Sequence, residues 1–180
     1  MSPSPALPKL TLVLGGARSG KSRFAEGLIA GHPGRPVYLA TAQAGDAEMA
    51  ERIRRHRARR GAGWTTLEEP LDLQRALASA TRDNGAVLVD CLTLWLSNLM
   101  AAGRSVEHEA QSLIESLPKL AAPVVFVSNE VGLGIVPDNA LARAFRDDAG
   151  LLHQAIAGAA DQVYLIAAGL PLLLKKKEDR

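Results

Sequence analysis

The sequence predicts an α/β domain in which helices flank a mostly parallel β-sheet. Short apolar runs alternate with segments of helical periodicity, and no internal repeat or low-complexity linker interrupts them. Most of the apolar runs are continuous, as expected for strands covered on both faces. The 180 residues, 47% of them hydrophobic, can bury one well-packed domain. We therefore expect one domain over residues 10–175, a flexible segment over 1–9 and a charged tail over 176–180.

The strands are predicted where apolar runs are bounded by glycine, proline or polar residues. They are Leu10–Leu14, Val37–Thr41, Trp64–Leu67, Ala86–Leu92, Pro123–Ser128, Gln162–Ala167 and Leu170–Leu174. A tight break at Gly169-Leu170-Pro171 opens the last run. We therefore expect this run to return as an antiparallel edge strand.

Helices are predicted between the strands, where the pattern has helical periodicity. They are Lys21–Ala30, Asp46–Arg60, Leu71–Ala80, Leu94–Ala101, Val106–Leu120 and Asp138–Ala157. The last helix carries one apolar stripe at steps of three and four, formed by Leu141, Phe145, Ala149, Leu152 and Ile156. Alternating strands and helices predict a parallel sheet, which collects ligands at the carboxyl ends of its strands. The polar residues at those ends include Thr41, Asp90 and Asn129.

A phosphate-binding motif follows the first strand and opens the first helix. The pattern G-x-x-x-x-G-K-[ST] is met by Gly15, Gly16, Ala17, Arg18, Ser19, Gly20, Lys21 and Ser22. Its glycines let backbone N–H groups turn toward phosphate oxygens, and the helix adds its positive dipole end. Lys21 supplies a charge to the β- and γ-phosphates, and Ser22 a hydroxyl ligand for Mg²⁺. A glycine-rich turn without a ligand would not need the Lys-Ser pair. The sequence therefore predicts a nucleoside triphosphate site in a P-loop NTPase fold of RecA-like type.

Asp90 is a candidate second ligand for Mg²⁺. It ends the apolar run 86–89, as a Walker B acid does, and could hold the ion opposite Ser22. The alternative is that Asp90 caps the helix that follows. The P-loop upstream favours the metal interpretation.

Composition excludes several classes of function. The formal net charge of +2 gives no global electrostatic argument for binding nucleic acid or a membrane surface. The single cysteine, Cys91, cannot form an intrachain disulfide and is expected in the core, which fits a cytoplasmic protein. The segment 1–9 is predicted to be neither a signal peptide nor an anchor, and Leu170–Leu174 is too short to span a membrane.

The segment Arg52–Arg60 is strongly basic and contains one histidine, His56. Helical spacing places His56 on one stripe with Met49, Ile53 and Arg60. Neighbouring cations disfavour the imidazolium, and a neutral imidazole is a nucleophile. The alternatives are a packing role for His56 beside a solvated arginine face, or phosphate recognition by the arginines. Interleaved aromatic residues, which would favour nucleic acid, are lacking here.

The remaining histidines, His32, His108 and His153, are weaker candidates. None has a partner at metal-ligand spacing, so no zinc site is expected.

Two long motifs resemble one known enzyme family. The first comprises the P-loop extended to Glu26, then Tyr38-Leu39-Ala40-Thr41-Ala42, then residues 46–57. The second comprises residues 128–137 and 142–147. In this order they resemble the bifunctional adenosylcobinamide kinase/adenosylcobinamide-phosphate guanylyltransferases, with similarity from about Leu10 to Lys175.

The resemblance implies two reactions in cobalamin biosynthesis. The first phosphorylates adenosylcobinamide with ATP or GTP. The second takes GMP from GTP through a GMP-histidine intermediate and passes it to adenosylcobinamide phosphate, which gives adenosylcobinamide-GDP. The histidine of the family maps onto His56. The resemblance also suggests a trimer, for which Leu170–Leu174 is a possible contact.

The nucleotide contacts of the family map onto several further positions. They are the P-loop, Ala40, Thr41, Ala42, Arg57, Ala58, Arg59, Arg60, Glu68 and Asp90. Glu68 is offered for the guanine N1/N2 edge, although the adjacent Glu69 is an alternative. The Asn129-Glu130 pair is either a turn or part of a substrate-facing loop. The alternative functions are a P-loop small-molecule kinase without guanylyltransfer and a nucleotide-dependent nucleic-acid-binding protein.

Overall fold

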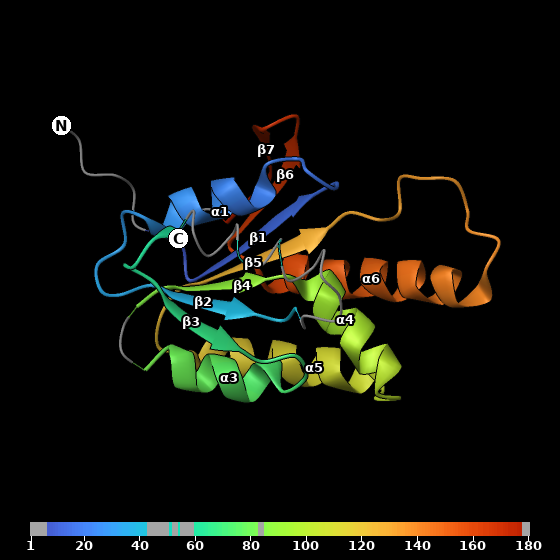
Figure 1. Ribbon diagram of the computed structural model, residues 1–180, viewed down its shortest axis with the longest axis horizontal. Helices are drawn as coiled ribbons and strands as arrows, with labels where there is room; N and C mark the ends of the chain where they lie inside the picture. The colour runs from blue at the N-terminus through green and yellow to red at the C-terminus, as the bar shows by residue number, and fades with distance from the viewer. Residues whose placement is uncertain (1–6, 43–50, 52–53, 55–59, 83–84, 178–180) are drawn as a thin grey trace.

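The computed structural model describes residues 7–42, 51, 54, 60–82 and 85–177. One sheet of seven strands lies at its centre, in the order β3-β2-β4-β5-β1-β6-β7 (Figure 1). The strands are β1 Leu10–Gly15, β2 Val37–Ala40, β3 Thr65–Glu68, β4 Val87–Asp90, β5 Val124–Asn129, β6 Gln162–Ala167 and β7 Leu170–Lys176. All neighbouring strands are parallel except β7, which pairs antiparallel with β6. The predicted fold class and antiparallel edge strand are confirmed.

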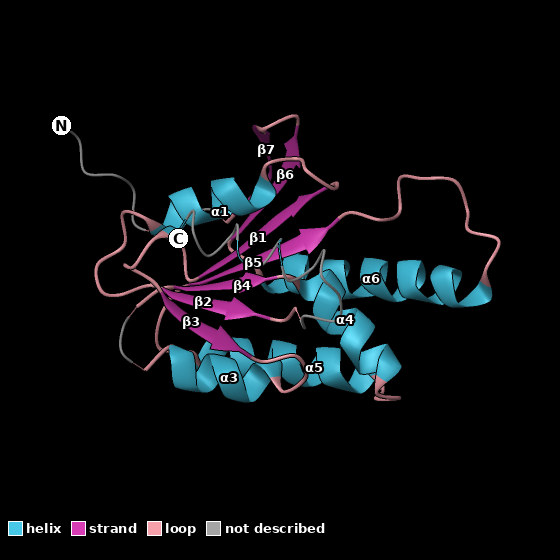
Figure 2. Ribbon diagram, viewed as in Figure 1, coloured by secondary structure: helices cyan, strands magenta, loops and turns pink. Residues whose placement is uncertain are grey.

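Helices cover both faces of the sheet (Figures 1 and 2). The helices are α1 Lys21–Ile29, α3 Leu73–Ala80, α4 Leu92–Ala101, α5 Val106–Ser116 and α6 Ala140–Ala159. On one face, α1 packs in a cluster that includes Ala25, Ile29 and Tyr38. Within the described ranges, the helices α3, α4, α5 and α6 lie on the opposite face. Of the expected helix 46–60, the described residues Glu51, Arg54 and Arg60 are helical.

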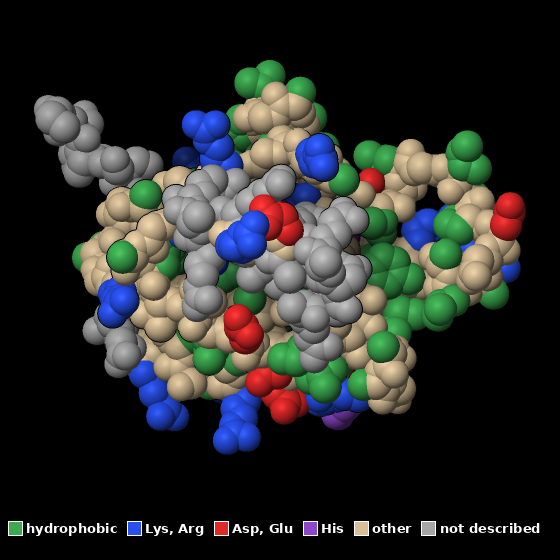
Figure 3. Space-filling model, in the orientation of Figure 1, with side chains coloured by type: hydrophobic (Ala, Val, Ile, Leu, Met, Phe, Trp, Pro, Cys, Tyr) green, Lys and Arg blue, Asp and Glu red, His purple; other side chains and the backbone are tan. Residues whose placement is uncertain are grey.

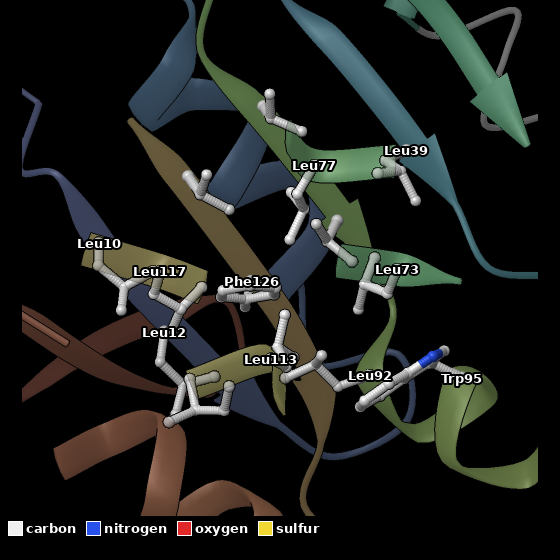
Figure 4. Packing of buried hydrophobic residues seen from close by; sticks show 14 of the residues in the cluster. Leu10, Leu12, Leu39, Leu73, Leu77, Leu92, Trp95, Leu113, Leu117 and Phe126 are labelled. Carbon is white, nitrogen blue, oxygen red and sulfur yellow. The ribbon is translucent and has the colours of Figure 1, made fainter. Parts of the chain in front are cut away.

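The larger hydrophobic cluster fills the space between the sheet and these four helices (Figure 4). Phe126 on β5 lies at its centre, next in register to Leu12 on β1 and Val89 on β4. Leu113 of α5 and Trp95 of α4 close the cluster from the helical side. Because successive strand residues face opposite sides, these strands contribute to both clusters, which explains their continuous apolar runs.

Several element boundaries differ from the prediction, among them the ends of β4 and α5. The run Ala86–Leu92 was predicted as one strand, but β4 ends at Asp90 and Leu92 already begins α4, with Cys91 as the N-cap. Cys91 is buried, as predicted. The helix predicted to end at Leu120 stops at Ser116, and Leu117–Lys119 form a 3₁₀ turn. Pro118 explains this end, because it lacks the N–H that an α-helix would need.

The apolar stripe of α6 was predicted over its whole length, but only its C-terminal part is buried. Ala149, Leu152 and Ile156 are in the core, whereas Leu141 is 67% exposed. The first half of α6 extends beyond the sheet, so no strand lies beneath it (Figure 1). The helix begins at Ala140 because the Asn139 side chain accepts hydrogen bonds from the N–H groups of Leu141 and Ala142 in the first turn.

The C-terminal strand is longer than predicted. Strand β7 continues to Lys176, which pairs with Gln162, so Lys176 belongs to the sheet and not to the charged tail. The Lys175 amine donates to the carbonyl oxygens of Ala157 and Gly158 and ties the strand to the end of α6. Among the described residues, no helix has the length and apolar character needed to cross a bilayer.

Candidate active site

The P-loop joins β1 to α1 at the carboxyl edge of the sheet. A Cβ atom on Gly15 would lie 2.5 Å from Ser19 Oγ and 2.7 Å from the Ile166 carbonyl oxygen, so the loop can close tightly only around glycine. Gly20, the N-cap of α1, has φ 97°, a conformation that other L-residues rarely adopt. These two glycines therefore fix the curvature that turns the N–H groups of the loop toward a phosphate.

Lys21 begins α1 and folds back across the loop. It is only 6% exposed, and its Nζ atom donates a hydrogen bond of 3.0 Å to the Gly16 carbonyl oxygen. The charge of Lys21 is thus held against the P-loop rather than in solvent. Ser22 follows on the first turn of the same helix and is half-buried.

Thr41, directly after β2, binds the start of α4. Its Oγ1 atom donates to the Cys91 carbonyl oxygen at 2.8 Å and accepts from the Cys91 N–H at 2.9 Å. The Thr41 carbonyl oxygen accepts from Asn98 at 2.8 Å. These bonds hold the segment after β2 beside Asp90. The Thr41 side chain is buried, and its hydroxyl group is engaged in these two hydrogen bonds with Cys91.

Asp90 ends β4 with one carboxylate oxygen available. Its Oδ2 atom is buried and accepts no hydrogen bond from any described residue. A buried carboxylate oxygen without a partner is costly, and such oxygens are ligands that Mg²⁺ prefers. Asp90 does not cap α4, whose N-cap is Cys91. The geometry therefore favours the Walker B interpretation over the capping one.

A second charged group with a buried, unpartnered atom lies against Tyr38 on β2. The Arg60 guanidinium carbon is 3.3 Å from the centre of the Tyr38 ring, and its Nη1 atom is buried and has no hydrogen-bond partner among the described residues. Burial raises the pKa of the Tyr38 hydroxyl, and the Asp90 carboxylate raises it further, whereas Arg60 acts in the opposite direction. Tyr38 is therefore a neutral phenol between two charges. Sequence reasoning assigned it no role.

The structure separates Glu68 from Glu69. Glu69 Oε1 accepts hydrogen bonds from the N–H groups of Leu71 and Asp72, both at 2.9 Å, at the start of α3. Glu68 ends β3, is exposed, and lies in one row with Ala40 and Asp90 across three strands. Glu69 therefore stabilises the turn before α3. The Glu68 carboxylate lies at the carboxyl edge of the sheet, in the same row as Asp90.

The segment after β5 forms a turn beside the P-loop. The Glu130 carboxylate accepts from the N–H groups of Gly132 and Leu133 at 2.7 and 3.1 Å, and its own N–H donates to Gly15 O at 3.1 Å. Asn129 Nδ2 donates to Thr93 Oγ1 at 2.9 Å. These bonds support the turn interpretation of the pair.

The same turn lines a cavity of about 720 Å³, whose other walls are the P-loop residues 16–19 and the end of β6. Beyond the turn, the chain continues into a projecting segment that carries hydrophobic side chains (Figure 3).

His153, a weaker candidate, lies behind the end of β5. Its Nε2 atom is 2.7 Å from Ser128 Oγ, and burial lowers its pKa, while Glu130 acts in the opposite direction. It contacts the strand rather than the P-loop. Four predicted residues, His56, Arg57, Ala58 and Arg59, lie outside the described residues.

The fold and the site define a P-loop NTPase domain. Solved structures with this fold include the flagellar accessory protein FlaH from Methanocaldococcus jannaschii, at a TM-score of 0.55 and 10% identity, covering 98% of this chain and 86% of that one. Another is the P4 protein from bacteriophage phi6 in complex with ADP, at a TM-score of 0.51 and 15% identity, covering 91% and 52%. At such identities the likeness concerns the fold alone.

Residues 11–174 match the family described as cobinamide kinase / cobinamide phosphate guanyltransferase, and the chain belongs to this family. It is 52% identical to the bifunctional adenosylcobalamin biosynthesis protein CobP of Pseudomonas aeruginosa, covering 91% of this chain and 96% of that protein. It is 41% identical to the corresponding protein CobU of Salmonella typhimurium, covering 92% and 99%. The predicted family and enzyme class are confirmed, and neither alternative function is favoured.

Proposed function

We propose that this protein phosphorylates the terminal hydroxyl of adenosylcobinamide with ATP or GTP, and then transfers GMP from GTP to the adenosylcobinamide phosphate. The observation that carries the proposal is the formed P-loop, with Lys21 folded over it, at the same sheet edge as the buried, unpartnered Oδ2 atom of Asp90 in a chain of this family.

In the kinase step, the substrate hydroxyl oxygen attacks the γ-phosphorus, and the bond from this phosphorus to the β-γ bridging oxygen breaks. The nucleoside diphosphate leaves with the electron pair, and the hydroxyl proton is released. Positioning and charge stabilisation supply most of the catalysis in such transfers. The backbone N–H groups of the P-loop and Lys21 would supply both, because they surround the phosphates with fixed positive charge.

We assign Mg²⁺ to Ser22 and Asp90. The ion would supply charge neutralisation for the β- and γ-phosphate oxygens. The buried, unpartnered Oδ2 atom of Asp90 fits this assignment, as does the position of Ser22 on the first turn of α1.

For guanylyltransfer, we propose His56 as the nucleophile. A neutral ring nitrogen attacks the α-phosphorus of GTP, an N–P bond forms, and pyrophosphate leaves with the electrons of the broken P–O bond. A phosphate oxygen of adenosylcobinamide phosphate then attacks the same phosphorus and releases the histidine. A nitrogen nucleophile divides one difficult transfer into two steps. Arg57, Arg59 and Arg60 would neutralise the triphosphate and the leaving pyrophosphate, with Ala40, Thr41, Ala42 and Ala58 around the nucleotide.

The test compares the native protein with His56→Ala in the presence of Mg²⁺ and GTP labelled at the α- or the γ-phosphate. The native protein is expected to retain α-label after denaturation, with the acid lability and alkali stability of a phosphorus–nitrogen bond. The variant should lose the α-label. His108→Ala replaces an exposed histidine and should keep it.

Either of two results would contradict the covalent mechanism: no α-label in the native protein, or equal α-label in the native protein and His56→Ala. If γ-phosphate still passed to adenosylcobinamide in that case, the protein would be a simple P-loop kinase.

Glu68→Gln is expected to lower the preference for GTP over ATP in the transfer step by about tenfold or more. A carboxylate accepts two hydrogen bonds from the guanine N1/N2 edge, and an amide cannot replace both. Competition between labelled GTP and ATP measures the preference. Glu69→Gln is the matched control, because this carboxylate is already bound to the N–H groups of Leu71 and Asp72 just before α3. If Glu68→Gln kept the same preference for GTP over ATP, Glu68 would not be the residue that recognises guanine.

We also propose a trimeric, cytoplasmic protein. The side chains of Leu170, Leu172, Leu173 and Leu174 are exposed along the edge strand β7. An exposed apolar edge is a liability in a monomer, so contact with another copy would stabilise it. The free, buried Cys91 is compatible with a reducing compartment.

A further inference from the structure

Two buried atoms of opposite charge near Tyr38 lack hydrogen-bond partners. Asp90 Oδ2 and Arg60 Nη1 are both inaccessible to solvent, and neither forms a hydrogen bond with a described residue. Buried charges normally pair, because an unpaired charge away from water is strongly destabilising. Two such groups close to one residue therefore need a structural explanation.

The Tyr38 ring supplies this explanation for the cation. The Arg60 guanidinium carbon lies 3.3 Å from the ring centre, so the plane of the cation rests on the aromatic face. Cation–π contacts are stronger at desolvated sites than at exposed ones. Tyr38 is itself only 7% exposed and packs with Leu88 in the cluster beneath α1, so the ring is a fixed support.

The strand register places the anion on the same side of the sheet. Tyr38 on β2 pairs with Leu88 on β4, and Asp90 is two residues further along β4. Residues two apart on a strand face the same side, and such diagonal neighbours are within reach of an aromatic side chain. Tyr38 thus contacts the cation and lies diagonally across from the carboxylate.

We propose that Tyr38 is a positioning residue that holds the Arg60 guanidinium away from the Asp90 carboxylate, so that both charges remain available to a Mg²⁺–nucleotide complex. This inference rests on the proposed function. Without the ring, the two groups would form a direct ion pair. Asp90 would then attract Mg²⁺ less strongly, and Arg60 would be turned away from the phosphates.

The experiment measures Mn²⁺ affinity at saturating GDP, by electron paramagnetic resonance of the free ion. Tyr38→Phe keeps the ring and should stay within about twofold of the native protein. Tyr38→Leu should bind Mn²⁺ about tenfold more weakly, because Arg60 then neutralises Asp90. The double variant Tyr38→Leu/Arg60→Gln should recover most of that loss, since the competing cation is gone.

Recovery in the double variant distinguishes positioning from packing, because removing Arg60 cannot repair a packing defect. Melting temperatures of all variants are recorded, and Tyr38→Met, which keeps volume but not the aromatic face, replaces Tyr38→Leu if the latter fails to fold. Unchanged Mn²⁺ affinity in Tyr38→Leu, or a loss that persists in the double variant, would overturn the inference.

The measurement needs neither turnover nor His56, so a missing GMP adduct would leave it valid. Failure of the native protein to bind Mn²⁺–GDP would instead refute the nucleotide site, and the inference with it.

Discussion

Lys21→Ala is expected to reduce kcat/KM by about 10²–10³-fold in both the kinase and the GMP-transfer step. The amine is buried and held at 3.0 Å from the Gly16 carbonyl oxygen, so its charge is positioned before the nucleotide arrives. Preorganised charge of this kind contributes about 10²–10³-fold per group, and both reactions place their phosphates in the same cradle.

Single-turnover assays with labelled ATP and GTP measure the two steps separately. Lys21→Arg should recover little of the lost activity, because a planar guanidinium does not replace a compact ammonium at this position. Lys119→Ala, an exposed lysine in the 3₁₀ turn, should behave as the native protein. If Lys21→Ala lost the kinase step and kept full GMP transfer, the two reactions would use different phosphate sites.

The parts of this site that sequence could predict are local. Lys21 and Ser22 follow from eight consecutive residues whose chemistry is specific. Asp90 follows from its place at the end of an apolar run. The order of the strands could not be predicted, because β5 inserts between β4 and β1 through contacts between residues far apart in the chain.

The role of Tyr38 could not be predicted either, because it depends on contacts between residues far apart in the chain. Its importance depends on Arg60, which is 22 positions away, and on the register with β4 that places Asp90 on the same face. The signals available in the sequence were its place near the end of a predicted strand and its place in the first family motif, and neither gives the side chain a role. The choice between Glu68 and Glu69 likewise required the hydrogen bonds that Glu69 accepts from the N–H groups of Leu71 and Asp72. Sequence position alone cannot distinguish the roles of two adjacent carboxylates.

The burial of α6 shows a limit of periodicity. Leu141 and Ile156 belong to one stripe in sequence, yet only Ile156 meets the sheet. A helical pattern records which side chains share a face, but not how far the partner surface extends. The exposed apolar residues at this end of α6 and on the segment before it are accounted for by their position beyond the sheet.

Phe126→Ala is expected to lower the free energy of unfolding by about 3–5 kcal/mol. Phe126 is fully buried on β5, and its neighbours in register are Leu12 and Val89, so the change leaves a cavity between the P-loop strand and the Asp90 strand. Domains of ordinary stability have only about 5–15 kcal/mol in total. The melting temperature should fall by about 10 °C.

Denaturant titration of the native protein, Phe126→Ala and Phe126→Leu measures this loss, with Leu151→Ala as a control at a side chain that is 65% exposed. Phe126→Leu should lose less, because it refills part of the cavity, and Leu151→Ala should change by no more than about 0.5 kcal/mol. A loss below about 1 kcal/mol in Phe126→Ala would show that the strands close the gap. Because β5 lies between β1, which leads into the P-loop, and β4, which ends at Asp90, such closure would also move the P-loop and Asp90 together, and nucleotide affinity would change more than stability.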